Sequence, residues 1–352
     1  MGSLYSARQL LADPDMYPIH VDWSKRSISF VRLNESEYSS ASFLDNQLAK
    51  NRLPLHFNLD DLLLECLTPA EFKRPVVYIL HSAFCCSTLL SRYFDRFGDF
   101  LVVREPGVLA SLMLTSPLFS SVKGAHLDDI SWLEFYDLAL RLMHRGYDDS
   151  RGVVVKVNDL NNILGERILC TQPEAKLIIL SGKLRDFIPA VLKSDKRRKL
   201  IRARLASHAV SITELMGLSV PAIEHLEDSE AAATLWAFNQ IIFYNLLRNA
   251  PAPRMLVLDS DQIADMTAET LARICEFSDV AADSVNVAQV LSDPEFGVYS
   301  KRRRQPYTSA DRDQEKRLLA ERFSAEIDRG MSWGRLVLKE ISAPCTEYQW
   351  LS

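Results

Sequence analysis

Five short apolar runs, separated by segments with helical spacing, constrain the fold of this 352-residue chain most strongly. Each run is about as long as a strand that is buried on both faces. Strands that alternate with helices favour a mostly parallel sheet with helices on both faces. The runs are residues 76–80, 100–103, 153–157, 176–180 and 254–259. The sequence therefore predicts an α/β fold.

The segments outside this alternation predict a smaller unit at each end of the chain. Residues 1–72 contain apolar stretches typical of short strands, and DDLLLECL has the spacing of a helix, so we expect a small N-terminal β extension. Residues 73–300 hold the α/β core. In residues 301–352 a basic stretch precedes a charged amphipathic segment, which predicts a lid loop and a C-terminal helical arm.

Charge and cysteine usage limit the partners and the compartment. The net charge of -5 provides no overall field for nucleic acid, which is therefore not expected as a partner. The 6 cysteines are scattered, without a C-x-x-C pair or a secretory signal, which favours free thiols and a cytoplasmic location. No apolar run reaches the roughly 18 residues that a membrane span needs. The oligomeric state stays open.

The stretch between the first core strand and the next helix, HSAFCCSTLL, consists mostly of small residues. A loop that leaves the carboxyl end of a buried strand and enters a helix presents unpaired N–H groups, which suit an anion such as phosphate. The nucleotide-triphosphatase signature G-x-x-x-x-G-K-S/T is absent, because neither glycine nor lysine lies between His81 and Thr88. The residues expected to bind the anion are Ala83, Phe84, Cys85, Cys86, Ser87 and Thr88.

Four stretches in series resemble the P-loop sulfotransferase superfamily, in particular its bacterial and tyrosyl-protein members. AFCCSTLL (83–90) is similar to P-K/R-S-G-T-T-x-L/M, and REP (104–106) follows the second strand, where the tyrosyl-protein enzymes carry a glutamate base. Residues 176–194 and 256–277 resemble two later stretches of the family. The resemblance implies a P-loop-type sheet, 3′-phosphoadenosine-5′-phosphosulfate as donor, a hydroxyl or amine on a small molecule or peptide as acceptor, and no metal.

Several positions depart from the pattern of that family. The lysine or arginine of its loop falls on Phe84, and the loop glycine falls on Cys86. The arginine and serine that bind the 3′-phosphate of the donor fall on Gly182 and Ala190. We expect other cations to compensate, either Lys183 and Arg185 at the 3′-phosphate or a basic loop that closes over the site. That loop consists of Lys301, Arg302, Arg303 and Arg304.

Three further side chains are candidates for the chemistry because they lie at or near strand ends. Glu105 follows the second strand and could accept the proton of the acceptor, or could form a structural salt bridge with Arg104. Lys156 lies inside an apolar strand, where lysine is rare without a partner, so it either reaches the donor or extends past the strand edge. His81 ends the first strand and is either catalytic or a buried structural histidine.

Three other classes of function remain open. Cys86 and Arg92 have the C-x5-R spacing of a phosphatase loop, although the sequence favours cysteines that serve as small buried residues in place of glycine. A kinase-like phosphotransferase would use ATP and Mg²⁺, with Asp259 and Asp261 as metal ligands. A degenerate member of the fold could bind a nucleotide or a partner without turnover, through the basic run at 193–204 or elsewhere, although that run also suits a solvated helix.

Overall fold

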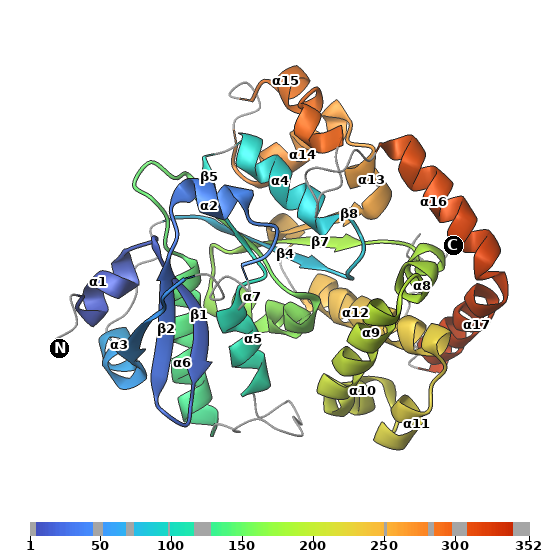
Figure 1. Cartoon of the computed structure of the whole chain (residues 1–352), viewed down its shortest axis with the longest axis horizontal. Helices are drawn as coiled ribbons and strands as arrows, with labels where there is room; N and C mark the ends of the chain where they lie inside the picture. Colours follow the sequence, from blue (N-terminus) through green and yellow to red (C-terminus); the bar gives the residue numbers. More distant parts are fainter. Residues whose placement is uncertain are drawn as a thin grey trace.

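The central sheet has five parallel strands in the order β5-β6-β4-β7-β8 (Figure 1). The computed structural model describes residues 5–44, 52–67, 74–97, 99–115, 128–249, 252–280, 285–297 and 308–340. The strands are β4 (Val76–His81), β5 (Phe100–Arg104), β6 (Gly152–Lys156), β7 (Lys176–Ser181) and β8 (Met255–Asp259). All five coincide with the apolar runs, so the predicted α/β fold is confirmed.

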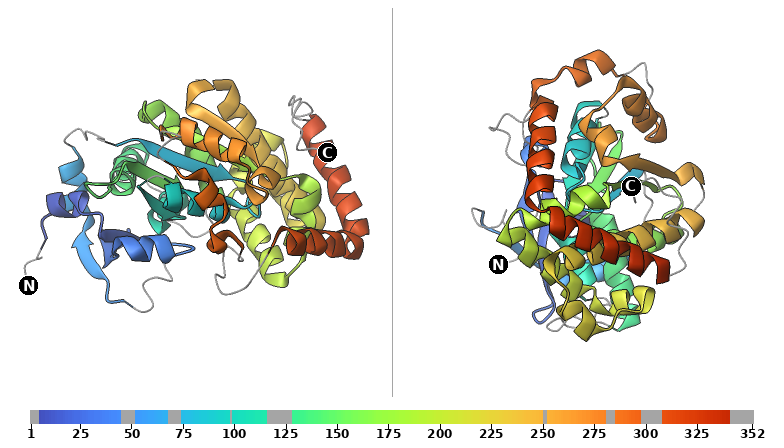
Figure 2. Two further views of the ribbon diagram at one scale, coloured as in Figure 1. Left: turned by 90° about the horizontal axis from the view of Figure 1, so that it is seen from above. Right: turned by 90° about the vertical axis from the view of Figure 1, so that its right-hand side faces the viewer.

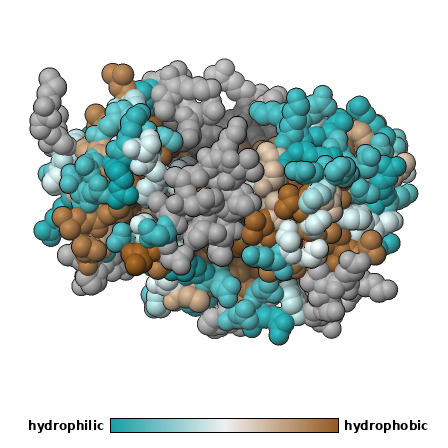
Figure 3. Space-filling view, turned by 90° about the horizontal axis from the view of Figure 1, so that it is seen from below, coloured by the Kyte–Doolittle hydropathy of each residue, from teal (hydrophilic) through white to brown (hydrophobic). Residues whose placement is uncertain are grey.

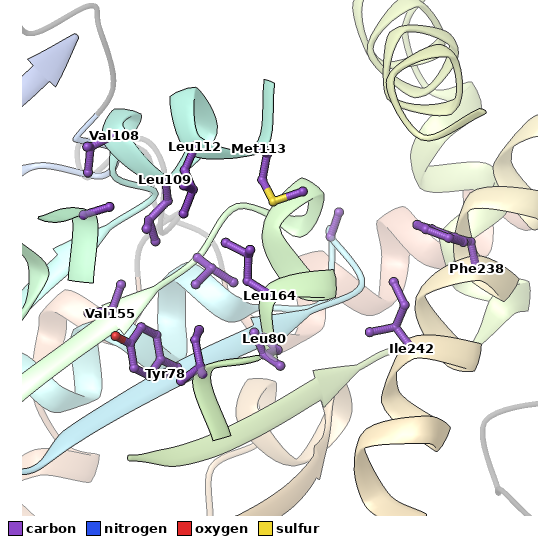
Figure 4. Packing of buried hydrophobic residues seen from close by; sticks show 14 of the residues in the cluster. Tyr78, Leu80, Val108, Leu109, Leu112, Met113, Val155, Leu164, Phe238 and Ile242 are labelled. Atoms are coloured by element: carbon purple, nitrogen blue, oxygen red, sulfur yellow. The ribbon is translucent and has the colours of Figure 1, made fainter. Parts of the chain in front are cut away.

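Helices cover both faces of this sheet, because alternate side chains of each strand point to opposite sides. Val77 and Ile79 of β4 pack in a cluster with α4 (Ser87–Phe97) and α14 (Ala268–Phe277). Tyr78 and Leu80 point to the opposite side. There they pack with helices α5 (Gly107–Leu114), α6 (Asp129–Met143) and α12 (Asp228–Asn249). Figure 4 shows α5 packed above the strands through its apolar side chains. The carboxyl ends of the strands are thereby held by two packed layers.

The N-terminal unit forms a second, antiparallel sheet of three strands. These are β1 (Met16–Asp22), β2 (Ser27–Arg32) and β3 (Leu55–Asn58), accompanied by α1 (Ala7–Ala12), α2 (Glu35–Ser40) and α3 (Leu59–Cys66). Arg145 ties this unit to the core, since its guanidinium donates to the carbonyls of Leu10 and Asp13. On its outer side, large apolar side chains such as Leu64 and Leu67 are exposed. Figure 3, which views the molecule from below, shows patches of apolar surface among hydrophilic residues.

The C-terminal arm consists of α16 (Ser309–Arg322) and α17 (Ser324–Glu340), which follow the side of the molecule (Figure 2). The indole of Trp333 on α17 donates to the Thr234 hydroxyl at 2.8 Å. Gly330 allows the close approach, because a Cβ there would lie 2.9 Å from the carbonyl oxygen of Ser229. The predicted lid, Lys301 to Arg304, lies outside the described residues. The predicted N-terminal β extension and helical arm are therefore both present.

The sequence predicts one long helical stretch from about Asp195 to Gly217, but the structure divides this stretch at His208 into α9 and α10, with most of the basic run in α9. The remaining elements are η2 (Asp159–Leu164), α7 (Gly165–Thr171), α8 (Leu184–Leu192), α9 (Asp195–Ser207), α10 (Ala209–Met216), α11 (Val220–Glu224), η3 (Ala252–Arg254), α13 (Ser260–Ala264), α15 (Val287–Leu291) and η5 (Pro294–Gly297). Within the described ranges, none of these helices has the length and apolar character to cross a bilayer.

Candidate functional site

The loop between β4 and α4 has a constrained backbone. Ala83, Phe84 and Cys86 have φ angles of 61°, 50° and 65°, in the left-handed region that side chains with a Cβ rarely adopt. Such strain persists only where the surrounding structure imposes it, and it is concentrated at ligand sites. The loop leaves the carboxyl end of β4 beside β7, where the strand order reverses. Ligands of open α/β sheets bind at this position.

Several donors converge at the end of this loop without partners. The amide N–H groups of Ser87, Thr88 and Leu89, at the start of α4, have no hydrogen-bond partner among the described residues. The hydroxyl of Thr88 is also buried and unpartnered in the described part of the chain. A buried hydroxyl without a partner is unfavourable, so an absent acceptor is the simplest explanation. The predicted cradle, Ala83 to Thr88, therefore has the donors that an anion needs.

His81 holds the start of this loop through hydrogen bonds of both ring nitrogens. Its Nδ1 accepts from the N–H of Ala83 at 3.1 Å, and its Nε2 is 2.9 Å from the carbonyl oxygen of Val157. Nε2 therefore carries the proton, and the ring is the neutral tautomer with both nitrogens engaged. The side chain is buried. This geometry does not support the expected catalytic role of His81, and we assign it to positioning the loop.

The two cysteines of the loop behave as small packing residues. Cys85 is buried, its thiol donates to the carbonyl of Leu180 at 3.4 Å, and burial raises its pKa to about 12. Arg92, which phosphatase chemistry would need at the phosphate, is buried and donates instead to Ser42 of the N-terminal unit at 3.1 Å. The C-x5-R spacing therefore does not correspond to a phosphatase loop here.

Glu105 and Lys156 meet at the ends of β5 and β6. The ammonium of Lys156, whose side chain is 1% exposed, donates to Oε1 of Glu105. The amide of Asn158 donates to Oε2 of Glu105 at 3.0 Å. Glu105 itself has a positive φ of 52°, which turns the chain away from β5 into α5. The carboxylate is thus fixed through both oxygens, and its side chain remains 16% exposed.

The alternative partner of Glu105, Arg104, points elsewhere. Its guanidinium is fully buried and pairs with Asp95 of α4, and it also donates to Ser91 and to the carbonyl of Tyr38 in α2. The predicted alternative of an Arg104–Glu105 salt bridge is therefore wrong. Arg104 instead joins α4 to the N-terminal unit behind the loop.

A second charged pair, which the sequence did not predict, lies next to Glu105. Arg204 of α9 pairs with Asp159 of η2, and both side chains are almost fully buried. Burial raises the pKa of Asp159, and the Arg204 guanidinium opposes that rise. Arg204 also reaches Asn158 at 3.5 Å. Arg204 is thus part of the site, whereas the sequence favoured a solvated helix for the run that contains it.

The residues expected to bind the 3′-phosphate lie at the opposite side of the loop. Lys183 precedes α8 and is 3.9 Å from the carboxylate of Asp261, and Arg185 is exposed in the first turn. Lys316 of α16 donates to both Asp186 and Asp261, at 2.7 and 3.0 Å. Lys183 therefore lies on this side of the loop together with Lys316 from the C-terminal arm, which the sequence did not assign to the site.

The aspartates proposed as Mg²⁺ ligands have other roles. Asp259 caps α13 by accepting from the N–H of Asp261 at 2.7 Å, and burial raises its pKa. Burial would also raise the pKa of Asp261, but contacts with Lys316 hold it below its usual value. Within the described ranges, no cluster of three or more His, Cys, Asp or Glu side chains could bind a metal. This arrangement does not favour the kinase-like alternative.

Gly182 and Ala190 are the two positions at which the sequence resemblance predicts an arginine and a serine that bind the donor. A Cβ at Gly182 would lie 3.0 Å from Oγ of Ser260, and the Gly182 carbonyl accepts from the indole of Trp236 at 2.8 Å. The carbonyl of Ala190 accepts from Arg197 at 2.6 Å. Both positions are therefore engaged in packing and backbone contacts.

Comparisons with known proteins identify sulfotransferases among solved structures. A sulfotransferase domain from the curacin biosynthetic pathway is 14% identical, with a TM-score of 0.40, over 74% of this chain and 96% of that one. A sulfotransferase from Alicyclobacillus acidocaldarius is 14% identical, with a TM-score of 0.37, over 76% and 96%. One from Mycobacterium tuberculosis is 13% identical, with a TM-score of 0.39, over 76% and 82%. No family model and no curated protein matches. A function for this chain is therefore inferred from the geometry of its site and not from these comparisons.

Proposed function

We propose that this chain is a sulfotransferase-like enzyme that moves a sulfuryl group from 3′-phosphoadenosine-5′-phosphosulfate to a hydroxyl or amine acceptor. The observation that carries the proposal is the strained loop between β4 and α4, which ends in the unpartnered amides and the buried Thr88 hydroxyl described above. These donors suit the oxygens of a phosphosulfate. The four sequence stretches that resemble sulfotransferases favour the same donor.

The charged residues beside the loop support the acceptor half of the reaction. In the transfer, the bond between sulfur and the bridging oxygen of the donor breaks, and a bond forms between sulfur and the acceptor oxygen or nitrogen. Glu105 accepts the proton that the acceptor loses, and 3′-phosphoadenosine 5′-phosphate leaves. Each carboxylate oxygen of Glu105 has a protein donor and keeps a lone pair for the acceptor. In this proposal Lys156 and Asn158 orient the base.

We assign the binding of the 3′-phosphate, and the closure of the site over the donor, to positively charged residues at the edge of the site. Lys183 and Arg185 remain the candidates for the 3′-phosphate, since both lie at the start of α8. Lys301, Arg302 and Arg303 remain candidates for a lid. The cysteines of the described part of the chain are free, which supports the proposed cytoplasmic location.

The test is calorimetric titration of the full chain with 3′-phosphoadenosine 5′-phosphate, beside AMP and ATP–Mg²⁺. Micromolar binding that requires the 3′-phosphate is the expected result. Binding of ATP–Mg²⁺ alone would instead favour a phosphotransferase. Absence of binding by all three would refute the proposal and leave a degenerate member of the fold.

Glu105→Gln provides the catalytic test once an acceptor has been found. The substitution keeps the shape and removes the proton acceptor, so turnover should fall by about 100-fold or more, the usual scale of general-base catalysis. Donor affinity should stay within about 2-fold, because Glu105 lies at the acceptor side, away from the loop amides. Equal loss of turnover and donor affinity would contradict the assignment of Glu105 as the base.

A further inference from the structure

The loop between β4 and α4 contains no cation of its own, since Phe84 lies where the resembling family has lysine or arginine. Two arginines from distant parts of the chain approach it instead. Arg197 of α9 lies against Phe84. Arg312 of α16 pairs with Asp265 at the end of α13, a helix that contacts α4, and its charge also acts on Cys86. Both of these loop residues have positive φ angles. The loop is therefore flanked by positive charge from two different helices.

Arg197 is anchored by two neutral groups, the Phe84 ring and a backbone carbonyl. Its guanidinium carbon is 4.7 Å from the centroid of the Phe84 ring, a cation–π contact. One of its nitrogens donates to the carbonyl of Ala190. Within the described part of the chain it forms no ion pair, whereas its neighbours Arg198 and Arg202 contact Asp228. An arginine without a carboxylate partner beside an anion cradle is available to the anion.

Of the three guanidinium nitrogens of Arg312, Nη2 is engaged and Nε has no partner among the described residues. Its Nη2 donates to Asp265 at 2.9 Å and lies 3.6 Å from Asp313. Its side chain is 13% exposed, and its Nε is buried without a hydrogen-bond partner among the described residues. A buried donor without an acceptor is unfavourable. Nε therefore remains for a ligand that enters beside Cys86.

Two lysines on this side of the loop are paired with carboxylates, as Arg312 is with Asp265. Lys316 lies between Asp186 and Asp261, and Lys183 faces Asp261 as well. Figure 1 shows α16, which carries Lys316 and Arg312, running beside α13 and α8. Lys316 thus attaches the helical arm to the core, and Lys183 joins the start of α8 to α13 within the core. Their charge is less available to a ligand than that of Arg197.

We propose that Arg197 and Arg312 bind the phosphosulfate or phosphate group in the loop, in place of the loop lysine. This inference rests on the proposed function, because it assigns the cations of the same anion site. Arg197 reaches the anion across the edge of Phe84, and Arg312 reaches it from the side of Cys86. In this proposal the positive charge that contacts the anion comes from α9 and from the C-terminal arm, and not from a lysine in the loop.

The experiment is calorimetric titration of full-length variants with 3′-phosphoadenosine 5′-phosphate. Arg197→Gln and Arg312→Gln should each weaken binding by about 10-fold to 100-fold, the scale of a hydrogen bond to a charged group. Arg202→Gln on α9 and Arg317→Gln on α16 are the matched controls and should bind as the wild type does. Thermal unfolding followed by circular dichroism checks that each variant is folded.

A charge-restoring variant separates a direct role from a structural one. Phe84→Lys in the Arg197→Gln background returns a cation to the loop and should recover most of the lost affinity. Wild-type affinity in both arginine variants would overturn this inference and leave the proposed function standing. Equal losses in the two control variants would also overturn it, because the effect would then be unspecific. Absence of wild-type binding would overturn both proposals together.

Discussion

Replacement of Arg204 by methionine should destabilise the protein by about 3–5 kcal/mol near neutral pH, the range found when one partner of a buried ion pair is removed. The side chains of Arg204 and Asp159 are 9% and 2% exposed, so the variant leaves a carboxylate buried without its cation. Methionine keeps much of the aliphatic volume of arginine. The loss of stability therefore reports the unpaired, buried carboxylate of Asp159 and not an empty cavity.

The loss of stability in Arg204→Met should grow as the pH rises. Burial raises the pKa of Asp159, and Arg204 opposes this rise, so the pKa rises further when Arg204 is removed. The native variant then holds a proton that the unfolded chain releases above its ordinary pKa of about 3.9. Stability of the variant falls by about 1.4 kcal/mol per pH unit from there until the native carboxyl has also ionised. The variant should thus be closer to wild type at pH 5 than at pH 7.5.

Urea unfolding at these two pH values measures both effects. Arg202→Met is the matched control, because Arg202 lies on the same helix and pairs with Asp228, yet both side chains are more than a third exposed. Its loss should stay within about 1 kcal/mol. If Arg204→Met cost no more than this control, or if its cost were the same at both pH values, the buried pair would not have the role assigned here.

Three further predictions test the loop and the core. Thr88→Val should stabilise the fold by about 1 kcal/mol, because it removes an unpartnered hydroxyl, and should weaken 3′-phosphoadenosine 5′-phosphate binding in calorimetry. Burial lowers the pKa of His144 and His208 to about 3, so urea midpoints should fall as the pH drops below about 6.5, where only the unfolded chain binds these protons. Gly152→Ala should cost about 1–3 kcal/mol in thermal unfolding, since its Cβ would lie 2.6 Å from the Pro75 carbonyl.

The sequence predicted the sheet well because its signal is local. Each core strand is a continuous apolar run, and the loop after β4 is recognisable from its small residues and from Ser87 and Thr88. The strand order was not predicted, because pairing depends on contacts between residues distant in the chain. Glu105 and Lys156 were predicted separately as strand-end residues. Their direct contact follows only from the adjacency of β5 and β6.

The charged partners of the site could not be read from the sequence. Arg204 lies in a run of basic residues, which predicts a solvated helix, yet it is buried against Asp159, 45 positions away. Arg312 and Lys316 belong to a polar helix whose composition indicates only exposure. A charged side chain becomes part of a site through a partner on another element. Periodicity and local composition carry no information about that partner.

The glycine at position 182, where the sequence resemblance predicts an arginine, has a structural explanation. Gly182 is buried, its carbonyl binds the Trp236 indole, and a Cβ there would lie 3.0 Å from the Ser260 hydroxyl and 3.7 Å from Cβ of Cys85. A Cβ at this position would already require the Ser260 side chain of α13 to shift by a few tenths of an ångström. The replacement is therefore part of the packing between β7, the loop and α13. Under the proposed function, the cations for the 3′-phosphate therefore come from residues that flank this junction, such as Lys183 and Arg185.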